Sequence, residues 1–255
     1  MEVCLVQTRL AWEAPASNRE HLEQFLSAAG AADLYVLPEM FSTGFSMNAA
    51  PLAETMEGET VAWMKRMARE LDGGVCGSLI VRDRGHFYNR FVLAQRNGDI
   101  STYDKRHLFR MSTENDHYSA GTERLTMSVG EFNLFPQVCY DLRFPVYSRN
   151  DLGFDLMVYV ANWPAARRDH WRTLLVARAI ENQCYVIGVN RVGIDGNDVA
   201  YCGDSMAVSF DGSLLLDLGD GEATARVSLD LAALTQWRGQ FPAWMDADGF
   251  DLRDP

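Results

Sequence analysis

The chain has 255 residues, of which 47% are hydrophobic, and a formal net charge of -12 at pH 7. This length predicts one domain over residues 1–255, and the acidic balance disfavours nucleic acid or an anionic membrane as partner, because both bind through basic surface. No apolar run is long enough to cross a bilayer and the chain does not begin like a signal peptide, so we expect a cytoplasmic protein.

The N-terminal segment predicts a strand, a helix and a second strand. Residues 2–7 are apolar enough for a strand, and Ser17-Asn18-Arg19-Glu20 has the pattern of a capping box at the start of a helix that ends at Gly30. Residues 34–37 form the second strand candidate. Units of this kind build pairs of parallel strands.

Glu39 follows the second predicted strand directly and is succeeded by Met40-Phe41. An average glutamate is a surface or helix-capping acid. Apolar neighbours, however, would desolvate this carboxylate and raise its pKa, which is the condition that a general base needs near neutral pH. We therefore treat Glu39 as a candidate catalytic residue.

A second helix and a meander of strands follow. Apolar spacing predicts a helix from Val61 to Leu71 that Gly73-Gly74 stops, and then strands over residues 75–81, 87–95 and 100–103. The pair Asn97-Gly98 between the last two strands is a strong hairpin signal. Parallel units followed by hairpins indicate a mixed sheet.

Lys105 comes directly after the meander, and a long loop over residues 110–121 follows it. A lysine beyond a strand is ordinarily a solvated surface charge, and only the parallel with Glu39 and Cys139 argues otherwise. The loop contains Glu114 and Tyr118, and its length is typical of a lid or site loop.

Cys139 ends a predicted strand over residues 132–138, and Pro145 suits the start of a helix behind it. This strand-to-helix elbow would expose a thiol and aim backbone N–H groups beside it. Most unpaired cysteines are small buried hydrophobes. The five cysteines are spread over positions 4, 76, 139, 184 and 202 without zinc-ligand spacing, which predicts neither a disulfide framework nor a structural metal.

The C-terminal part adds strands and one long helix. Residues 155–161 predict a buried strand ending in Asn162-Trp163-Pro164, and Asp169 is positioned to cap a helix that is apolar enough to lie between layers. Strands are also predicted over residues 185–190, 201–210 and 214–216. The whole pattern fits two packed sheets with helices outside, an α-β-β-α sandwich, although periodicity alone leaves a single large mixed sheet open.

Glu39, Lys105 and Cys139 each fall at the carboxyl end of a predicted strand, the edge where α/β folds place their ligands. Together they supply a thiol to attack a carbonyl, a carboxylate to take its proton and a cation to hold the developing oxyanion. A cysteine–histidine pair is less attractive, because His107 and His117 lie in a charged loop.

Three stretches around these residues resemble the nitrilase superfamily of carbon-nitrogen hydrolases: Leu37-Pro38-Glu39-Met40-Phe41, Tyr103-Asp104-Lys105-Arg106-His107-Leu108-Phe109 and Val138-Cys139-Tyr140-Asp141-Leu142-Arg143-Phe144-Pro145. Phe41-Ser42-Thr43-Gly44-Phe45, Tyr159-Val160-Ala161-Asn162-Trp163-Pro164 and further local matches resemble its omega-amidase branch. The resemblance implies the α-β-β-α sandwich, no metal or organic cofactor, and a homodimer or higher homo-oligomer. It also implies a small-molecule amide substrate, with hydrolysis of the terminal amide of 2-oxoglutaramate or 2-oxosuccinamate.

Carried over by motif, the resemblance implies that Cys139 is the nucleophile, Glu39 the general base and then acid, and Lys105 the oxyanion stabiliser with the backbone N–H of Tyr140. Glu114 matches a second glutamate that positions substrate and lysine, although Ala120 stands where many relatives have proline. The candidates for contact with substrate are Phe41, Phe45, Tyr118, Trp163 and the arginines Arg110, Arg143, Arg167 and Arg168. For Arg143 we favour a structural role, paired with Asp141 or a neighbouring acid.

Other functions remain open from the sequence. Within enzymes, the chain could hydrolyse N-carbamoyl compounds or another small amide, and a true nitrilase is less favoured. From a different class, Cys139 could be a redox-sensing thiol, which would leave Glu39 and Lys105 without a purpose. A catalytically silent interaction module is disfavoured, because such a protein would be free to lose the three residues.

Overall fold

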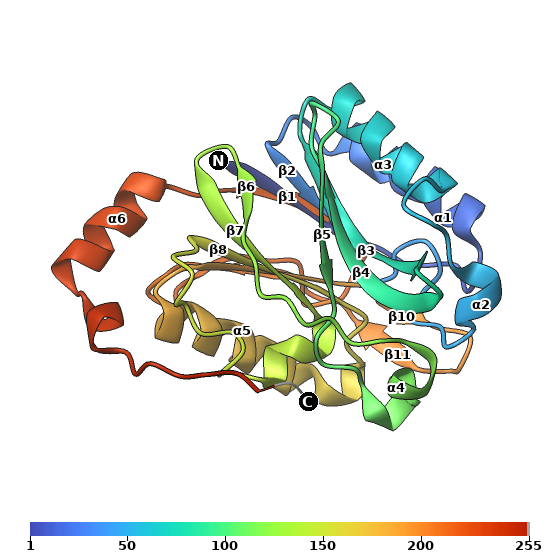
Figure 1. The fold of residues 1–255 in the computed structure, drawn as a ribbon. Helices are drawn as coiled ribbons and strands as arrows, with labels where there is room; N and C mark the ends of the chain where they lie inside the picture. The colour runs from blue at the N-terminus through green and yellow to red at the C-terminus, as the bar shows by residue number, and fades with distance from the viewer. Residues whose placement is uncertain (254–255) are drawn as a thin grey trace.

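Two six-stranded sheets form the centre of the computed structural model, which describes residues 1–253 (Figure 1). Across the first sheet the order is β14 (Ala223–Ser228), β1 (Glu2–Gln7), β2 (Leu34–Val36), β3 (Gly74–Asp83), β4 (His86–Ala94) and β5 (Ile100–Asp104). Across the second it is β13 (Leu214–Asp217), β12 (Met206–Val208), β9 (Tyr185–Asn190), β8 (Leu156–Ala161), β7 (Phe132–Val138) and β6 (Met127–Val129). Both sheets are mixed, as the sequence predicts.

The two sheets share one pairing pattern. Starting from β14 in the first sheet or β6 in the second, an antiparallel pair is followed by two parallel pairs and then two antiparallel pairs. The strands β2 and β8 therefore occupy equivalent positions, and so do β1 and β7. The carboxyl ends of β2 and β8 lead to Glu39 and Asn162, which meet at the site described below.

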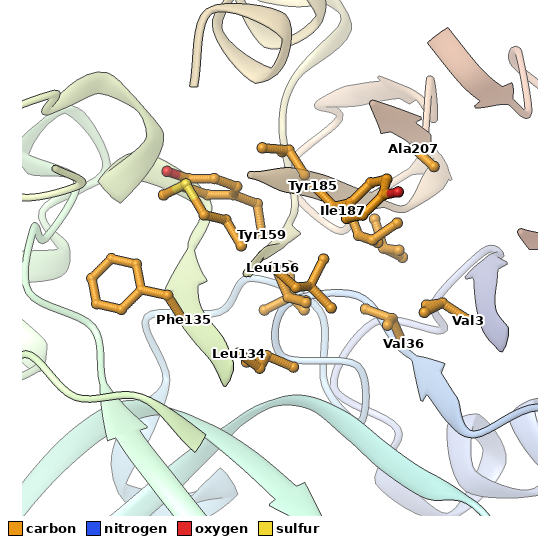
Figure 2. Close-up of a cluster of buried hydrophobic side chains, with 14 of the residues drawn as sticks. Val3, Val36, Leu134, Phe135, Leu156, Tyr159, Tyr185, Ile187 and Ala207 are labelled. Carbon is orange, nitrogen blue, oxygen red and sulfur yellow. The ribbon is translucent and has the colours of Figure 1, made fainter. Parts of the chain in front are cut away.

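Aliphatic side chains fill the space between the sheets. Val3 and Val36 of the first sheet are fully buried in one cluster with Leu134 and Leu156 of the second, and Figure 2 shows these side chains close to one another. Because alternate residues of a strand point to opposite faces, the same strands present a second apolar face to the helices outside.

Helices cover the outer face of each sheet. The helices α1 (Pro15–Ala28) and α3 (Glu59–Glu70) lie on the first sheet, where Leu22, Leu26 and Met64 share a buried cluster with Tyr35. The helix α5 (Arg168–Asn182) lies on the second sheet (Figure 1). The helix α6 (Leu231–Gln240) packs against the sandwich through Leu234, which is fully buried in the same cluster as Leu156. This arrangement is the predicted α-β-β-α sandwich. The prediction that α5 lies between layers is wrong, because Ile180 is 53% exposed.

The strands predicted at residues 2–7, 34–37, 75–81, 87–95, 100–103, 132–138, 155–161, 185–190 and 214–216 are confirmed to within a few residues. The short strands β6 and β10 (Val192–Ile194), together with β14 and α6, were not predicted. Short helical segments complete the described chain: α2 (Ala49–Leu52), η1 (Arg110–Ser112), α4 (Glu114–His117), η2 (Cys139–Arg143), η3 (Ala165–Arg167) and η4 (Ala243–Asp246). None of the helices within residues 1–253 has the length and apolar character needed to cross a membrane.

Two predicted helix caps are wrong. Helix α1 begins at Pro15 with Ala14 as its N-cap, so Ser17 lies inside the helix and not at its start. Proline suits the first helical position because its missing N–H needs no partner there. Helix α5 follows η3 without a side-chain cap, and Asp169 lies in its first turn.

Two predicted elements differ because the backbone turns earlier than expected. No helix starts at Pro145, since η2 begins at Cys139 and only a turn follows it. The strand predicted over residues 201–210 is split in two, because Gly203 and Asp204 adopt φ values of 67° and 53°. The first part, β11 (Ala200–Cys202), pairs with β10 outside both main sheets, and the second part is β12.

Candidate active site

Glu39 and Lys105 meet in the space between the sheets, although they follow strands far apart in the sequence. The Lys105 Nζ atom lies 2.9 Å from Glu39 Oε1, and neither side chain is exposed to solvent. Lys105 also lies beside the ring of Phe45, 5.1 Å from its centroid. The carboxyl end of β2 and the carboxyl end of β5 thus bring one acid and one cation into contact, as the strand ends predict.

Glu114 is the second carboxylate on Lys105. Its oxygens lie 3.0 and 2.9 Å from Nζ, and it too is fully buried. The backbone N–H of Phe109 donates to Glu114 Oε2 at 2.6 Å, which fixes the loop that carries both residues. The family resemblance implies that Glu114 positions the lysine, and the structure places Glu114 in direct contact with Lys105.

The charges of this cluster determine its protonation. Burial alone would lower the pKa of Lys105, but the carboxylates of Glu114 and Glu39 outweigh it, so the pKa of Lys105 is raised and the ammonium is retained. Burial raises the pKa of Glu114, and the charge of Lys105 offsets only part of this effect. One cation thus holds two buried carboxylates together.

Cys139 lies on the wall of the same cavity as Lys105. Burial and, after it, the negative charge of Glu39 raise the pKa of the Cys139 thiol well above its usual value, and Lys105 opposes them. The resting sulfur is therefore a protonated thiol whose proton must be removed during attack. The carboxylate that raises the thiol pKa is the nearby group able to accept that proton.

The backbone at Cys139 has a left-handed conformation, with φ of 45°. Met40, the residue after Glu39, and Thr113, the residue before Glu114, share this conformation at φ of 42° and 61°. Such conformations cost about 1–3 kcal/mol each for residues with a β-carbon, and they persist where surrounding contacts impose them. The turn at Cys139 takes the place of the predicted strand-to-helix elbow.

Asp141 ties the cysteine turn to the lysine segment. Its Oδ1 accepts hydrogen bonds from the backbone N–H of His107 at 2.9 Å and from His107 Nδ1 at 2.7 Å. Its Oδ2 accepts from the hydroxyl of Tyr103 at 2.9 Å and from the backbone N–H of Val138 at 3.0 Å. The first sheet is thereby linked to the turn that begins at Cys139.

Two asparagines that the sequence did not single out complete the site. Asn89 Nδ2 donates to Glu39 Oε1 at 2.7 Å and to Glu114 Oε1 at 3.1 Å. The backbone N–H of Asn162 donates to Glu39 Oε2 at 2.8 Å, its Nδ2 donates to the Glu39 carbonyl, and its own carbonyl lies 3.9 Å from Cys139 Sγ. The sequence signal that could have found Asn162 is its place directly after the strand predicted over residues 155–161, since Glu39 also follows a predicted strand.

The Asn162→Ala variant is expected to lower kcat by about 10- to 100-fold, because losing a buried hydrogen bond costs about 1–3 kcal/mol. Alanine removes the donor to the Glu39 carbonyl and keeps the backbone N–H that binds Glu39 Oε2. Steady-state kinetics on an amide substrate measure the change. Asn197→Ala, at another asparagine of the cavity wall, is the matched control and should stay within about twofold of native; equal losses in both variants would contradict the assignment.

The cavity has a volume of about 720 Å³, and several elements contribute its walls. Among the predicted contact residues, Phe45, Tyr140 and Trp163 line it. Loop residues around Trp12, the segment around Met111 and the β10–β11 hairpin form the rest of the wall. This volume lies within the range of sites for small molecules.

Four predicted contact residues do not line the cavity, namely Phe41, Arg110, Tyr118 and Arg168. Phe41 is fully buried in the core, with its ring centroid 5.8 Å from that of Trp63. Arg110 is exposed outside the cavity wall. The Tyr118 hydroxyl donates to the carbonyl of Ser46 at 2.5 Å, so this residue packs behind the site. Aromatic residues next to a motif thus fill the core as readily as the site.

Two of the four candidate arginines line the cavity, and the other two, Arg110 and Arg168, lie outside it. Arg143 and Arg167 line the cavity, whereas Arg168 pairs with Asp204 at 2.7 Å. The predicted pairing of Arg143 with Asp141 or a neighbouring acid is wrong: no acidic side chain within residues 1–253 forms an ion pair with Arg143, and its guanidinium lies 4.8 Å from the centroid of the Trp163 ring. The partners of Asp141 are His107, Tyr103 and a backbone N–H instead.

No group of three or more His, Cys, Asp or Glu side chains in the described part of the chain is arranged to hold a metal ion. The polar side chains of the cavity wall include a thiol, an ammonium, amides, guanidinium groups, hydroxyls and the carboxylates of Glu13 and Asp195. What this arrangement can do chemically is attack a carbonyl carbon, stabilise negative charge on its oxygen and transfer protons through a carboxylate.

Comparisons with known proteins agree with this chemistry. A family model described as carbon-nitrogen hydrolase matches residues 2–239. Omega-amidase YafV of Escherichia coli strain K12 is 44% identical over 253 residues, 99% of this chain and 98% of the relative. The 2-oxoglutaramate amidase of Bacillus subtilis strain 168 is 32% identical over 250 residues, 96% of each chain. The crystal structure of XC1258 from Xanthomonas campestris, a CN-hydrolase superfamily protein with an arsenic adduct in its active site, has a TM-score of 0.97 at 43% identity and 99% coverage of both chains.

Proposed function

The chain belongs to the carbon-nitrogen hydrolase family, and we propose that within it the protein is an omega-amidase. It hydrolyses the terminal amide of small 2-oxo dicarboxylic acid monoamides, such as 2-oxoglutaramate and 2-oxosuccinamate, to the acid and ammonia. The observation that carries this proposal is the 44% identity to an omega-amidase over 99% of the chain. The contact between Glu39 and Lys105 beside Cys139 supports it chemically.

In the first half of the proposed reaction, Cys139 Sγ attacks the amide carbon while Glu39 takes the thiol proton. Lys105 and the backbone N–H of Tyr140 stabilise the oxyanion that forms. The carbon–nitrogen bond then breaks, Glu39 returns its proton to the nitrogen, and ammonia leaves a thioester on Cys139. The raised pKa of the thiol supports this order, because the proton is still on sulfur when the substrate arrives.

In the second half, a water molecule attacks the thioester carbon and gives a proton to Glu39. The carbon–sulfur bond breaks, the proton passes to the sulfur, and the carboxylic acid leaves. Glu114 touches neither sulfur nor Glu39 directly in this scheme. Its two contacts with Lys105 Nζ support the role of a positioning residue for the lysine.

Arg143 binds the substrate's carboxylate in this proposal. It lies four residues after Cys139 in the 3₁₀ helix η2, so the two Cα atoms are about 8 Å apart at a rise of about 2 Å per residue. The amide and carboxylate carbons of 2-oxoglutaramate are four bonds apart, about 5 Å when extended. An arginine on the cavity wall without an acidic partner can therefore reach the far end of the substrate while the amide lies at Cys139.

The proposal also includes two properties that the family resemblance implies, a homodimer that extends the sandwich across its interface and a cytoplasmic location. Neither enters the chemistry above, because the acid, the cation and the thiol all come from one chain.

The decisive experiment is ammonia release from 2-oxoglutaramate by native protein and by Cys139→Ala. We expect turnover by the native protein and none by the variant, because alanine cannot form the thioester. Mass spectrometry of the acid-quenched native reaction should find the acyl adduct on Cys139, and circular dichroism should show the variant folded. Retained turnover in Cys139→Ala would remove this residue from its role. Turnover of N-carbamoyl acids or nitriles in place of omega-amides would replace the proposed substrate class.

A further inference from the structure

The guanidinium of Arg143 faces the cavity, and it has a neutral hydrogen-bond partner outside the cavity. Arg143 Nη2 lies 3.1 Å from His170 Nδ1, on the first turn of α5. A guanidinium has only donors, so His170 Nδ1 must accept through its lone pair, and the ring carries its proton on Nε2. His170 is exposed and is no part of the cavity wall.

Arg143 is thus held from two directions without loss of its charge. The Trp163 ring lies under the guanidinium at 4.8 Å, and Trp163 is itself only 3% exposed. The Trp163 Nε1 group donates to the carbonyl of Arg167 at 2.8 Å, which fixes the ring. An acidic partner would instead neutralise the guanidinium and compete with an anionic ligand.

Arg167, the other arginine of the cavity wall, offers a comparison within the same site. Its guanidinium lies 5.4 Å from the centroid of the Phe109 ring, and no side-chain acceptor for it is found within residues 1–253. Only Arg143 combines a stacked ring with a neutral acceptor on its outer side. Of the two arginines, Arg143 is therefore the one whose side-chain position is fixed before a ligand binds.

We infer that His170 is a positioning residue for substrate specificity: as a neutral acceptor it fixes the Arg143 guanidinium over Trp163, ready for the carboxylate of an anionic amide. This inference rests on the proposed function for the identity of the substrate, and on the contacts above for the role of His170. According to this inference, His170 contributes to the selectivity for anionic substrates from outside the cavity, because it orders the side chain of Arg143.

Two variants separate the acceptor from the ring. His170→Asn keeps an acceptor atom at the δ position without the ring, and His170→Phe keeps a ring without an acceptor. We expect His170→Phe to raise the KM for 2-oxoglutaramate by about three- to tenfold, because the free arginine must then be ordered on binding. The value of kcat should stay within about twofold, and His170→Asn should remain close to native in both constants.

Binding of 2-oxoglutarate, the acid product of the proposed reaction, tests the inference without turnover when it is measured by calorimetry. Its Kd should rise by the same factor in His170→Phe and still more in Arg143→Met, and stay unchanged in His86→Phe, a matched exposed histidine with Nδ1 3.1 Å from the Ser119 hydroxyl. An unchanged Kd in His170→Phe or in Arg143→Met would overturn the inference. If these shifts appear while 2-oxoglutaramate is not hydrolysed, the proposed function fails and the inference stands.

Discussion

The Lys105→Met variant is expected to slow ammonia release by about 10³-fold or more, the upper range for loss of an oxyanion donor. It should also lose about 3–5 kcal/mol of the free energy of unfolding at pH 7, as when one partner of a buried ion pair is removed. The reason is that Lys105 is the only cation in contact with Glu39 and Glu114 in the described part of the chain, and all three side chains lack solvent exposure.

The pH dependence of the Lys105→Met variant has a defined sign. Without the ammonium the two carboxylates repel each other, so the already raised pKa of Glu114 rises further. A group with a raised pKa binds its proton more tightly in the folded state, and stability is then lost as pH rises. The free energy of unfolding of the variant, measured by urea titration, should therefore increase as the pH is lowered from 8 to 5.

Two further variants separate stability from catalysis at this position. Adding Glu114→Gln to Lys105→Met removes one buried charge and should restore much of the stability but none of the activity. Lys65→Met changes the one other lysine of the chain, which lies on α3, and should leave both properties near native. A Lys105→Met protein as stable as native at pH 7 would show that the ammonium does not hold the two carboxylates together.

Much of the fold could be predicted because each local signal agreed with its neighbours. Up to residue 104, the strand, helix and hairpin patterns predicted the correct elements, because the spacing of apolar residues and the positions of turn residues indicated the same boundaries. The three strand-end residues Glu39, Lys105 and Cys139 were found by their place after strands, which depends on chain direction alone. The errors at Ser17, Asp169 and Pro145 concern helix starts, where several neighbouring residues can cap or begin a turn.

The rest of the site depends on contacts between segments that the sequence does not pair. Asn162 binds Glu39 across 123 positions, and Asp141 binds His107 across 34, so neither contact has a local pattern. The shared pairing order of the two sheets, which places Asn162 opposite Glu39, exists only once both sheets are formed. Whether Phe41 or Phe45 faces the cavity is decided in the same way, by how the chain turns after β2.

The Glu39→Gln variant is expected to stop hydrolysis and, at the same time, to make Cys139 more reactive toward iodoacetamide. Loss of a general base slows such reactions by about 10²–10⁴-fold. The thiol behaves in the opposite sense: after burial, the charge of Glu39 is the largest contribution that raises the pKa of Cys139, and Lys105 lowers it. Removing the negative charge while the ammonium stays lowers the thiol pKa, so more thiolate is present at a given pH.

Alkylation rates at pH 8, followed by peptide mass spectrometry at Cys139, measure this change. Each unit by which the pKa falls should raise the rate about tenfold while the thiol is mostly protonated. Glu114→Gln is the matched control and should give a smaller increase, because Glu114 contributes less to the thiol pKa than Glu39 does. Slower alkylation in Glu39→Gln than in native protein would mean that Glu39 promotes the thiolate already in the resting state. The proposed order of proton transfer, in which sulfur keeps its proton until the substrate binds, would then have to be abandoned.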